Sequence, residues 1–229
     1  MFVLLLPSMN AAAQEIQVHF DPRHTVHSDV APRNYVTVTF QGAIADKLGS
    51  TSGFLDLDFN QKNGNIGLAY LELKRDFRFN RFPLLLHLEF NGGVSKDRNG
   101  SGFSLPNAYL AGTGYARALG KLNLSTYLVY KYNSFEKSSH DVQWSLLWSV
   151  KLWDSRITLS GFLDVWTENK DRMSGRGGKK MILLTEPQFW YNFNRHFALG
   201  TEIEISNNFY AKYKSRVYVF PTLAAKWTF

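Results

Sequence analysis

Residues 122–132 read LNLSTYLVYKY, in which apolar and polar side chains alternate. One face carries Leu122, Leu124, Leu128 and Tyr130. The other face carries Asn123, Ser125, Tyr127 and Lys131. A period of two residues is typical of a β-strand whose faces meet different surroundings, whereas a helix would scatter these side chains around its circumference. Residues 142–152 and 156–168 repeat the pattern, which indicates a chain built from strands.

Twelve such segments follow one another, at 15–20, 35–42, 53–60, 66–75, 83–92, 107–117, 122–132, 142–152, 156–168, 181–193, 197–206 and 217–229. Long polar connections such as NKDRMSGRGGKK alternate with short ones such as ALGK, WDSR and NRH. In a soluble β-sandwich, nothing requires long and short connections to alternate along the chain. An outer-membrane barrel does sort them, and it has an even number of strands. We therefore expect an all-β fold, a 12-stranded antiparallel transmembrane β-barrel with periplasmic termini and long external loops.

The composition is consistent with this class. Aromatic residues make up 15% of the chain, cysteine is absent, and no stretch approaches the roughly 20 apolar residues that a spanning helix needs. The apolar block MFVLLLP and the small triplet before Gln14 predict a signal peptide at residues 1–13. Residues 14–229 then form a single outer-membrane barrel domain, located in the outer membrane of a Gram-negative bacterium.

The last segment supports the same interpretation. Its apolar face carries Val217, Val219, Leu223, Ala225, Trp227 and the C-terminal Phe229. A C-terminal aromatic residue that ends an alternating strand resembles the signal recognised by the barrel-assembly machinery, which we expect as a partner through Phe229. Pro221 cannot donate a ladder hydrogen bond, so we expect a bulge or a missing hydrogen bond beside it.

The polar faces of the strands should line a lumen, because charge exposed to hydrocarbon costs about 2–4 kcal/mol at the bilayer midplane. The candidate lumen and substrate-binding residues are Asp56, Asp58, Tyr70, Glu72, His87, Glu89, Tyr127, Lys131, Lys151, Asp164, Trp166, Glu186, Trp190, Glu202, Glu204 and Lys226. Carboxylates accept hydrogen bonds from hydroxyl and amino groups, and aromatic rings offer flat faces, so together they suit a small polar solute. The alternative is that these charges pair with one another and fill a narrow interior.

Acids dominate this lumen set although the chain has a net charge of +7. The surplus positive charge falls in the connections, at Arg172, Arg176, Lys179, Lys180, Lys212, Lys214 and Arg216. We expect outer-membrane lipid and lipopolysaccharide as partners, and these bases either meet lipid phosphates or are simply solvated. An export signal and the inward sorting of acids argue against nucleic acid as a partner.

Several stretches resemble a known family. They are LLTEPQFWYNF (183–193), GTEIEISNNF (200–209), PTLAAKWTF (221–229), HLEFNGG (87–93) and LPNAYLAG (105–112). They resemble an outer-membrane β-barrel family of unknown function related to the nucleoside-specific channel-forming (Tsx-like) proteins. The resemblance implies a twelve-stranded barrel, a narrow passage and nucleoside uptake, but it supplies no substrate-contacting residues.

Three functions follow as hypotheses. The first is a channel for passive, selective uptake of a small polar solute, with nucleosides as the implied solutes. The second is a non-conducting barrel that binds a partner or serves as a scaffold, its lumen closed by pairs such as Lys74 with Glu72 or Lys151 with Asp164. The third is an outer-membrane enzyme that uses His87 with Glu89, or His140 and Asp141 with the preceding serines. No diagnostic catalytic motif supports the third hypothesis, so we expect no enzyme.

We also expect neither a metal ion nor a cofactor. The histidines His24 and His27 lie near Asp21 and Asp29, but this spacing in a loop lacks the helix or turn that fixes metal-ligand geometry. The basic run RMSGRGGKK contains no P-loop pattern.

Overall fold

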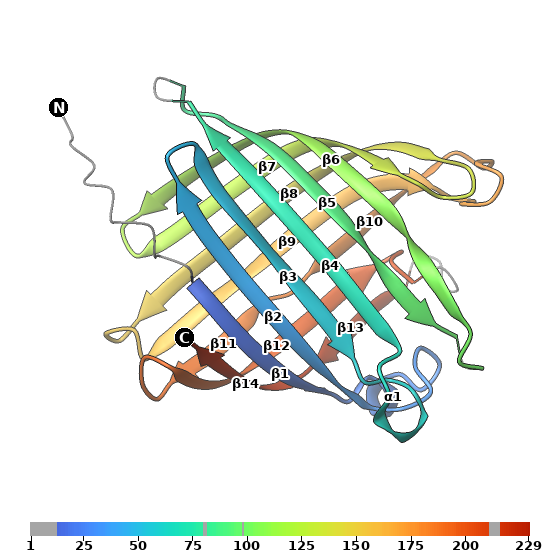
Figure 1. Cartoon of the computed structure of the whole chain (residues 1–229), viewed down its shortest axis with the longest axis horizontal. Coiled ribbons are helices and arrows are strands. Elements are labelled where there is room, and N and C mark those ends of the chain that lie inside the picture. The colour runs from blue at the N-terminus through green and yellow to red at the C-terminus, as the bar shows by residue number, and fades with distance from the viewer. Residues whose placement is uncertain (1–12, 80–81, 98, 211–215) are drawn as a thin grey trace.

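The computed structural model describes residues 13–79, 82–97, 99–210 and 216–229, and it shows antiparallel strands arranged around a barrel (Figure 1). The elements are β1 (Ala13–Asp21), α1 (Arg23–Val26), β2 (Tyr35–Asp46), β3 (Gly49–Asp58), the 3-10 turn η1 (Lys62–Gly64), β4 (Leu68–Arg78), β5 (Leu85–Lys96), β6 (Gly102–Leu119), β7 (Leu122–Asn133), β8 (Ser139–Leu152), β9 (Ile157–Asn169), β10 (Lys179–Thr185), β11 (Gln188–Asn192), β12 (Phe197–Asn207), β13 (Val217–Pro221) and β14 (Leu223–Thr228). In the described part of the chain, neither α1 nor η1 approaches the length and apolar character that crossing a membrane would require.

The fourteen segments make twelve strands, because two pairs of segments are halves of one interrupted strand. β10 and β11 both lie between β9 and β12, and Pro187 separates them. β13 and β14 both pair with β12, and Thr222 separates them. β14 also pairs with β1, with Val18 opposite Ala225, and this last pairing closes the sheet on itself. The predicted twelve-stranded antiparallel barrel is confirmed.

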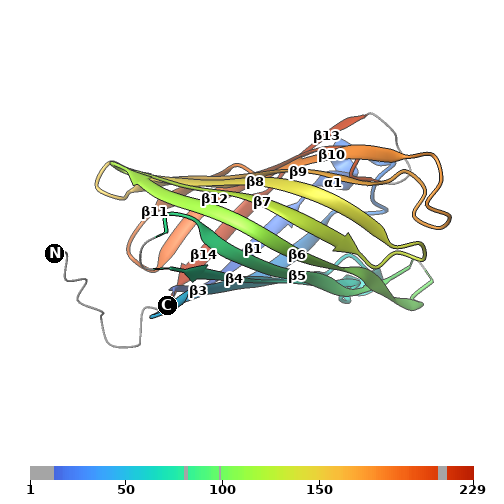
Figure 2. The ribbon, with the colours of Figure 1, turned by 90° about the horizontal axis from the view of Figure 1, so that it is seen from above.

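The connections are sorted between the two ends of the barrel, and the C-terminus lies at the end with the short turns (Figures 1 and 2). The connections at that end lie within 47–48, 79–84, 120–121, 153–156 and 193–196, of which residues 80 and 81 are outside the described part. The connections at the opposite end lie within 22–34, 59–67, 97–101, 134–138, 170–178 and 208–216, of which residues 98 and 211–215 are outside it. Two of these loops are shorter than the sequence predicted, because β5 continues to Lys96, β6 starts at Gly102 and β8 starts at Ser139.

The wall of the barrel is apolar outside and polar inside. On the outer face, 58% of Leu128 and 70% of Leu223 are exposed, whereas on the inner face Gln143 is only 4% exposed. A soluble protein has the opposite arrangement, because it buries its apolar side chains against one another. The outer wall therefore needs an apolar surrounding, as a transmembrane barrel does.

The C-terminal strand shows the irregularity that Pro221 predicts. β13 ends at Pro221 and β14 begins at Leu223, while the alternation of faces continues across the break. Thr222 bridges the gap, because its backbone N–H donates to the carbonyl oxygen of Glu202 at 2.8 Å. The predicted signal peptide at residues 1–13 lies outside the described residues except for Ala13, which begins β1. Lys212 and Lys214 also lie outside them.

A charge placed on the outer wall should therefore cost more than one placed inside. We expect Leu128→Arg to lower the free energy of unfolding by about 2–4 kcal/mol, because its guanidinium would face hydrocarbon. The matched variant Ser125→Arg lies on the inner face of the same strand, beside a cavity, and should cost less. Urea unfolding of the barrel in lipid vesicles measures both. Equal costs would contradict the assignment of the two faces.

Candidate functional site: the barrel lumen

The strand register places the predicted lumen residues on the inner face, except Glu186, which lies outside the paired strands. Asp56 lies opposite Tyr70, Lys74 opposite Glu89, and Gln188 opposite Glu202, each pair on neighbouring strands. The same parity carries the remaining predicted residues inward, including those on β7, β8, β9 and β14. Their role in binding a solute stays a prediction. The structure also shows which of these residues contact one another.

One wall of the lumen is acidic. On β3, Asp56 and Asp58 accept hydrogen bonds from the hydroxyls of Thr39 and Thr37 on β2, at 2.5 and 2.7 Å. On β12, Glu202 accepts a hydrogen bond from the Gln188 side chain at 2.5 Å. These hydroxyl and amide partners are neutral, so they do not compensate the charge of a carboxylate, although the guanidinium of Arg23 interacts electrostatically with Asp58.

Glu186 lies within this acidic wall, at the break between β10 and β11. Its carboxylate is close enough to those of Glu202 and Glu204 on β12, and to those of Asp56 and Glu72, for mutual electrostatic repulsion. Its backbone N–H donates to the carbonyl oxygen of Phe162 at 3.2 Å. Acids from β3, β4 and β12, together with Glu186 at the break between β10 and β11, thus gather in one region of the lumen.

Lys74 on β4 is the cation nearest this region. Its Nζ atom lies 2.9 Å from Glu72 and 3.7 Å from Glu89, and it also interacts electrostatically with Asp164 on β9. The predicted pair Lys74–Glu72 is therefore present. The predicted pair Lys151–Asp164 is wrong: Asp164 lies opposite Ser145, six residues along β8 from Lys151, a separation of about 20 Å.

His87 connects β4, β5 and β7 towards the turn end. Its Nδ1 atom lies 2.7 Å from Asp76 and its Nε2 atom lies 3.1 Å from Glu89. The hydroxyl of Tyr127 donates to the other oxygen of Asp76 at 3.0 Å, and the Tyr127 ring lies 4.4 Å from the His87 ring between centroids. A cavity of about 250 Å³ adjoins this cluster on the side of the turns, and it is lined partly by Asp76, Tyr127 and Ser125. The cluster therefore lies against this cavity, in the half of the barrel nearer the turns.

The two inner tryptophans are covered rather than open to a solute. Nζ of Lys226 lies 4.2 Å from the centre of the Trp190 ring, and Nζ of Lys131 lies 4.4 Å from that of Trp166. Trp190 has no exposed surface. Its ring packs over Gly200, where an added Cβ would lie 2.7 Å from ring atom Cε3. These rings stabilise buried lysines through cation–π contacts, so they are not free to stack on a flat solute.

Arg23 closes part of the loop end. It lies in α1, and its guanidinium contacts Asp21 at 2.6 Å and Glu204 at 3.2 Å. It also donates to the hydroxyl of Tyr210 at 2.8 Å and lies over the ring of Phe220 at 4.7 Å. This single cation therefore ties the loop between β1 and β2 to the inner wall at β12 and β13.

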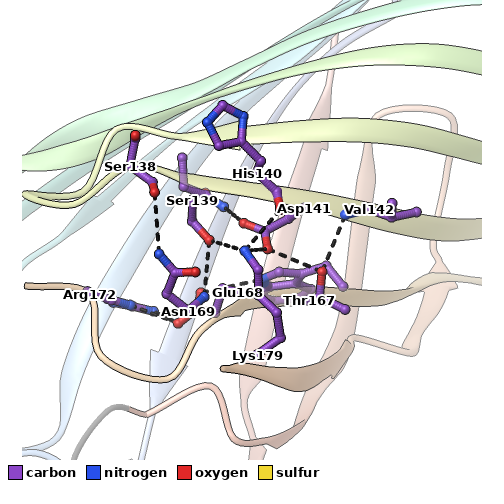
Figure 3. A network of polar contacts seen from close by, with 12 residues as sticks. Ser138, Ser139, His140, Asp141, Val142, Thr167, Glu168, Asn169, Arg172 and Lys179 are labelled. Atoms are coloured by element: carbon purple, nitrogen blue, oxygen red, sulfur yellow. Dashed lines mark hydrogen bonds and ion pairs between the residues drawn. The ribbon is translucent and has the colours of Figure 1, made fainter. Parts of the chain in front are cut away.

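A second polar network anchors the loop between β9 and β10 (Figure 3). Glu168 has an exposed side-chain fraction of only 3% and pairs with Arg172 at 2.7 Å and Lys180 at 3.1 Å. Asp141, which is fully buried, pairs with Lys179 at 2.7 Å. The carboxylate of Glu168 thus pairs with two basic residues, and that of Asp141 pairs with one.

The catalytic group considered from the sequence, His140 and Asp141 with the preceding serines, does not come together in this network. Ser139 is 1% exposed and accepts a hydrogen bond from Lys179 at 2.8 Å. His140 points away from Ser139 and Asp141, towards the outer face, where its Nδ1 atom lies 2.5 Å from the hydroxyl of Tyr130 (Figure 3). The imidazole and the serine hydroxyl are therefore on opposite faces of β8. In the described part of the chain, no group of three or more acidic or histidine side chains is arranged to hold a metal ion.

Sequence reasoning missed several inner residues, namely Gln17, His19, Asp21, Asp76, Asn91, Asp141 and Gln143. Most of them obey the same two-residue period. Asp21, Asp76 and Asp141 were missed because each lies just beyond the end of a predicted segment. Extending every segment to the next glycine, proline or charged turn would have found them.

Removing Arg23 should release the loop that it holds. Arg23→Ala leaves Asp21 and Glu204 without their shared cation, and breaking such a buried pair costs on the order of 3 kcal/mol. We expect trypsin to cleave after Arg33, within the same loop, roughly tenfold faster or more. Arg23→Lys, which keeps the charge, should show a smaller increase. An unchanged cleavage rate in Arg23→Ala would show that other contacts hold the loop.

Comparisons with known proteins agree with this architecture. The structure is similar to a NanC porin, with a TM-score of 0.59 and 9% identity over 94% of this chain and 99% of that chain. It is also similar to LpxR from Salmonella typhimurium, with a TM-score of 0.50 and 10% identity over 95% and 100% of the two chains. Identities this low show a common fold only.

At the level of sequence, no curated protein matches the chain. The model of one family, described as a domain of unknown function (DUF5020), matches residues 13–229. That match covers the whole barrel, and it agrees with the predicted resemblance to a barrel family of unknown function. The relation to nucleoside-specific channels stays a prediction. The chain is a closed twelve-stranded β-barrel, and it belongs to the DUF5020 family.

Proposed function

We propose that this protein is an outer-membrane channel through which small polar solutes pass passively, with neutral and cationic solutes favoured over anionic ones. One observation carries the proposal: charged side chains enclosed by the barrel keep accessible surface. Lys74 keeps 25% of its side chain exposed and Glu72 keeps 16%. A lumen packed solid would leave such groups no accessible surface. The outer-membrane location is supported by the apolar outer wall and by the porin-like fold.

The charge of the lumen supports the choice of solute. Among the described residues, no basic side chain forms an ion pair with the carboxylates of Glu186, Glu202 and Asp56. Such oxygens accept hydrogen bonds from hydroxyl, amino and ammonium groups. Acidic linings favour cations and repel anions in water-filled pores. Passage also requires weak binding, which hydrogen bonds to partly solvated carboxylates provide.

Nucleoside uptake is the finer form of the proposal, and it rests on the predicted family resemblance. The lumen suits a nucleoside through its hydrogen-bonding groups rather than through stacking, because Trp166 and Trp190 are covered by lysines. A sugar or a small amine would meet the same carboxylates. The identity of the solute is therefore decided by flux measurements with each class.

A second candidate function is a non-conducting barrel that binds a partner. The contacts of Arg23 at the loop end and of Lys74 in the centre favour it, since both narrow the passage. We propose no catalytic role, because Ser139 and His140 lie on opposite faces of β8.

Solute flux in liposomes distinguishes the two functions. Barrels reconstituted into liposomes should admit uridine, arabinose and putrescine faster than glucuronate, as measured by liposome swelling. Arg23→Ala should admit them faster still. If neither the native chain nor Arg23→Ala admits any of these solutes or conducts ions, the barrel is non-conducting and the channel proposal is wrong.

Neutralising the acidic wall should weaken the preference for cations. In planar bilayers under a KCl gradient, we expect Glu186→Gln combined with Glu202→Gln to lower the K⁺/Cl⁻ permeability ratio severalfold, towards one. Folding should be retained, because the change removes repulsion between neighbouring carboxylates. Asp154→Asn, in the exposed turn between β8 and β9, is the matched control and should leave the ratio unchanged. An unaltered ratio in the double variant would place the selective region elsewhere.

A further inference from the structure

The outer wall is interrupted by a groove near the loop end of the barrel. The groove has a volume of about 390 Å³ and is lined by Met181, Leu183, Ile205, Ser206, Asn207, Asn208 and Val217. Its apolar side chains project from the outer faces of β10, β12 and β13, where Met181 is 64% exposed and Val217 is 58% exposed. These apolar side chains therefore face away from the lumen, although the inward-facing Ser206 also lines the groove.

The groove exists because two neighbouring strands stop pairing there. The ladder between β10 and β12 ends at the pair Leu183 and Asn207, although β10 continues to Lys179 along β9. Beyond that point, side chains span the gap: Nδ2 of Asn208 donates to the carbonyl oxygen of Met181 at 2.9 Å, and Nζ of Lys180 donates to that of Asn208 at 3.1 Å. The result is a gap in the wall that has apolar sides and a polar rim nearer the loops.

Basic residues border the groove at its loop end. Arg216 immediately precedes Val217 and has half of its side chain exposed. The backbone N–H of Lys170 donates to the carbonyl oxygen of Gly178, which lies three residues before Met181, or about 10 Å along the strand. Arg176 lies exposed in the same loop.

The loop that carries these bases is held in a defined shape. Asp171 accepts hydrogen bonds from the hydroxyl of Ser174 and from the backbone N–H groups of Met173 and Ser174, and these bonds lower the pKa of Asp171. Arg172 is anchored to Glu168. Arg172 and Lys180 share the Glu168 carboxylate, and Arg216 pairs with Asp29 at 3.2 Å. Lys170 and Arg176 form no ion pair with a described residue, although Arg176 is close enough to Asp171 for electrostatic attraction.

We propose that this groove binds one lipid of the outer leaflet, a phosphorylated glycolipid of the lipid A type. One acyl chain lies between Met181 and Leu183 on one side and Ile205 and Val217 on the other, and Lys170, Arg176 and Arg216 meet the phosphate. The groove opens on a wall that faces hydrocarbon, so the lipid tail covers it, and basic residues near a membrane surface select anionic head groups. The inference rests on the outer-membrane location in the proposed function, but not on conduction.

The binding can be tested with the full chain in nanodiscs. We would incorporate equal amounts of lipid A and phosphatidylethanolamine, release the protein into a mild detergent, and count retained lipids by native mass spectrometry. The native chain should retain one lipid A molecule in preference to phosphatidylethanolamine. Lys170→Gln with Arg176→Gln should lower this preference roughly tenfold, since each base near an anionic surface contributes appreciably. Val217→Trp, which fills the groove without changing charge, should also lose the lipid.

Arg117→Gln with Lys121→Gln removes two exposed bases at the turn end and is the matched control. It should retain lipid A as the native chain does. Heat-dependent migration on gels confirms that each variant is folded. Equal retention of both lipids by the native chain, or equal loss in the control, would overturn the proposal. Loss of conduction with retained lipid A would instead contradict the channel function alone.

Discussion

The closing of the hydrogen-bond ladder between β1 and β14 is the constraint on which the rest of the structure depends. Val18 pairs with Ala225 and Gln17 with Lys226, so the described strands form one closed sheet, although β10 has no β12 partner on the loop-end side of Leu183. In hydrocarbon an unpaired backbone group costs several kcal/mol, and closure is how a sheet avoids that cost. Once the sheet is closed, every second side chain must enter an enclosed space. The polar lumen is a direct consequence.

A barrel of twelve strands is too narrow to solvate its interior charges as bulk water would. It lies between barrels of about eight strands, which side chains fill, and those of 16 to 18, which hold a wide channel. The charges therefore find partners inside the wall: Lys74 lies between Glu72 and Glu89, and Arg23 lies between Asp21 and Glu204. Acids exceed bases along β3 and β12, and Glu186 adds a carboxylate at the break between β10 and β11, which makes this part of the lumen acidic. Arg172 and Arg176, two of the surplus bases, lie in the loop between β9 and β10, and Arg176 is exposed to solvent.

Most of the fold could be predicted because a two-residue period is local information. The segments around 122–132 and 142–152 each show which of their side chains face inward, without reference to any other strand. The prediction failed at the strand ends. Asp76 and Asp141 continue the inward alternation of β4 and β8, opposite His87 and Lys131. Each lies one residue beyond a predicted segment, because a charged side chain at a strand end resembles the start of a connection. The early start of β8 at Ser139 was missed for the same reason.

The sequence by itself determined the number of strands, their facing and the sorting of the loops, because each follows from the period of two and from turn composition. Only the tertiary structure decided which inner side chains meet. Lys131 and Lys226 cover the tryptophans, and Glu186 meets Asp56, through pairings between residues far apart in the chain. Such pairings depend on the stagger between strands and on closure, which no local pattern encodes. For this reason an inward-facing ring was predictable, but whether its face is open to a solute was not.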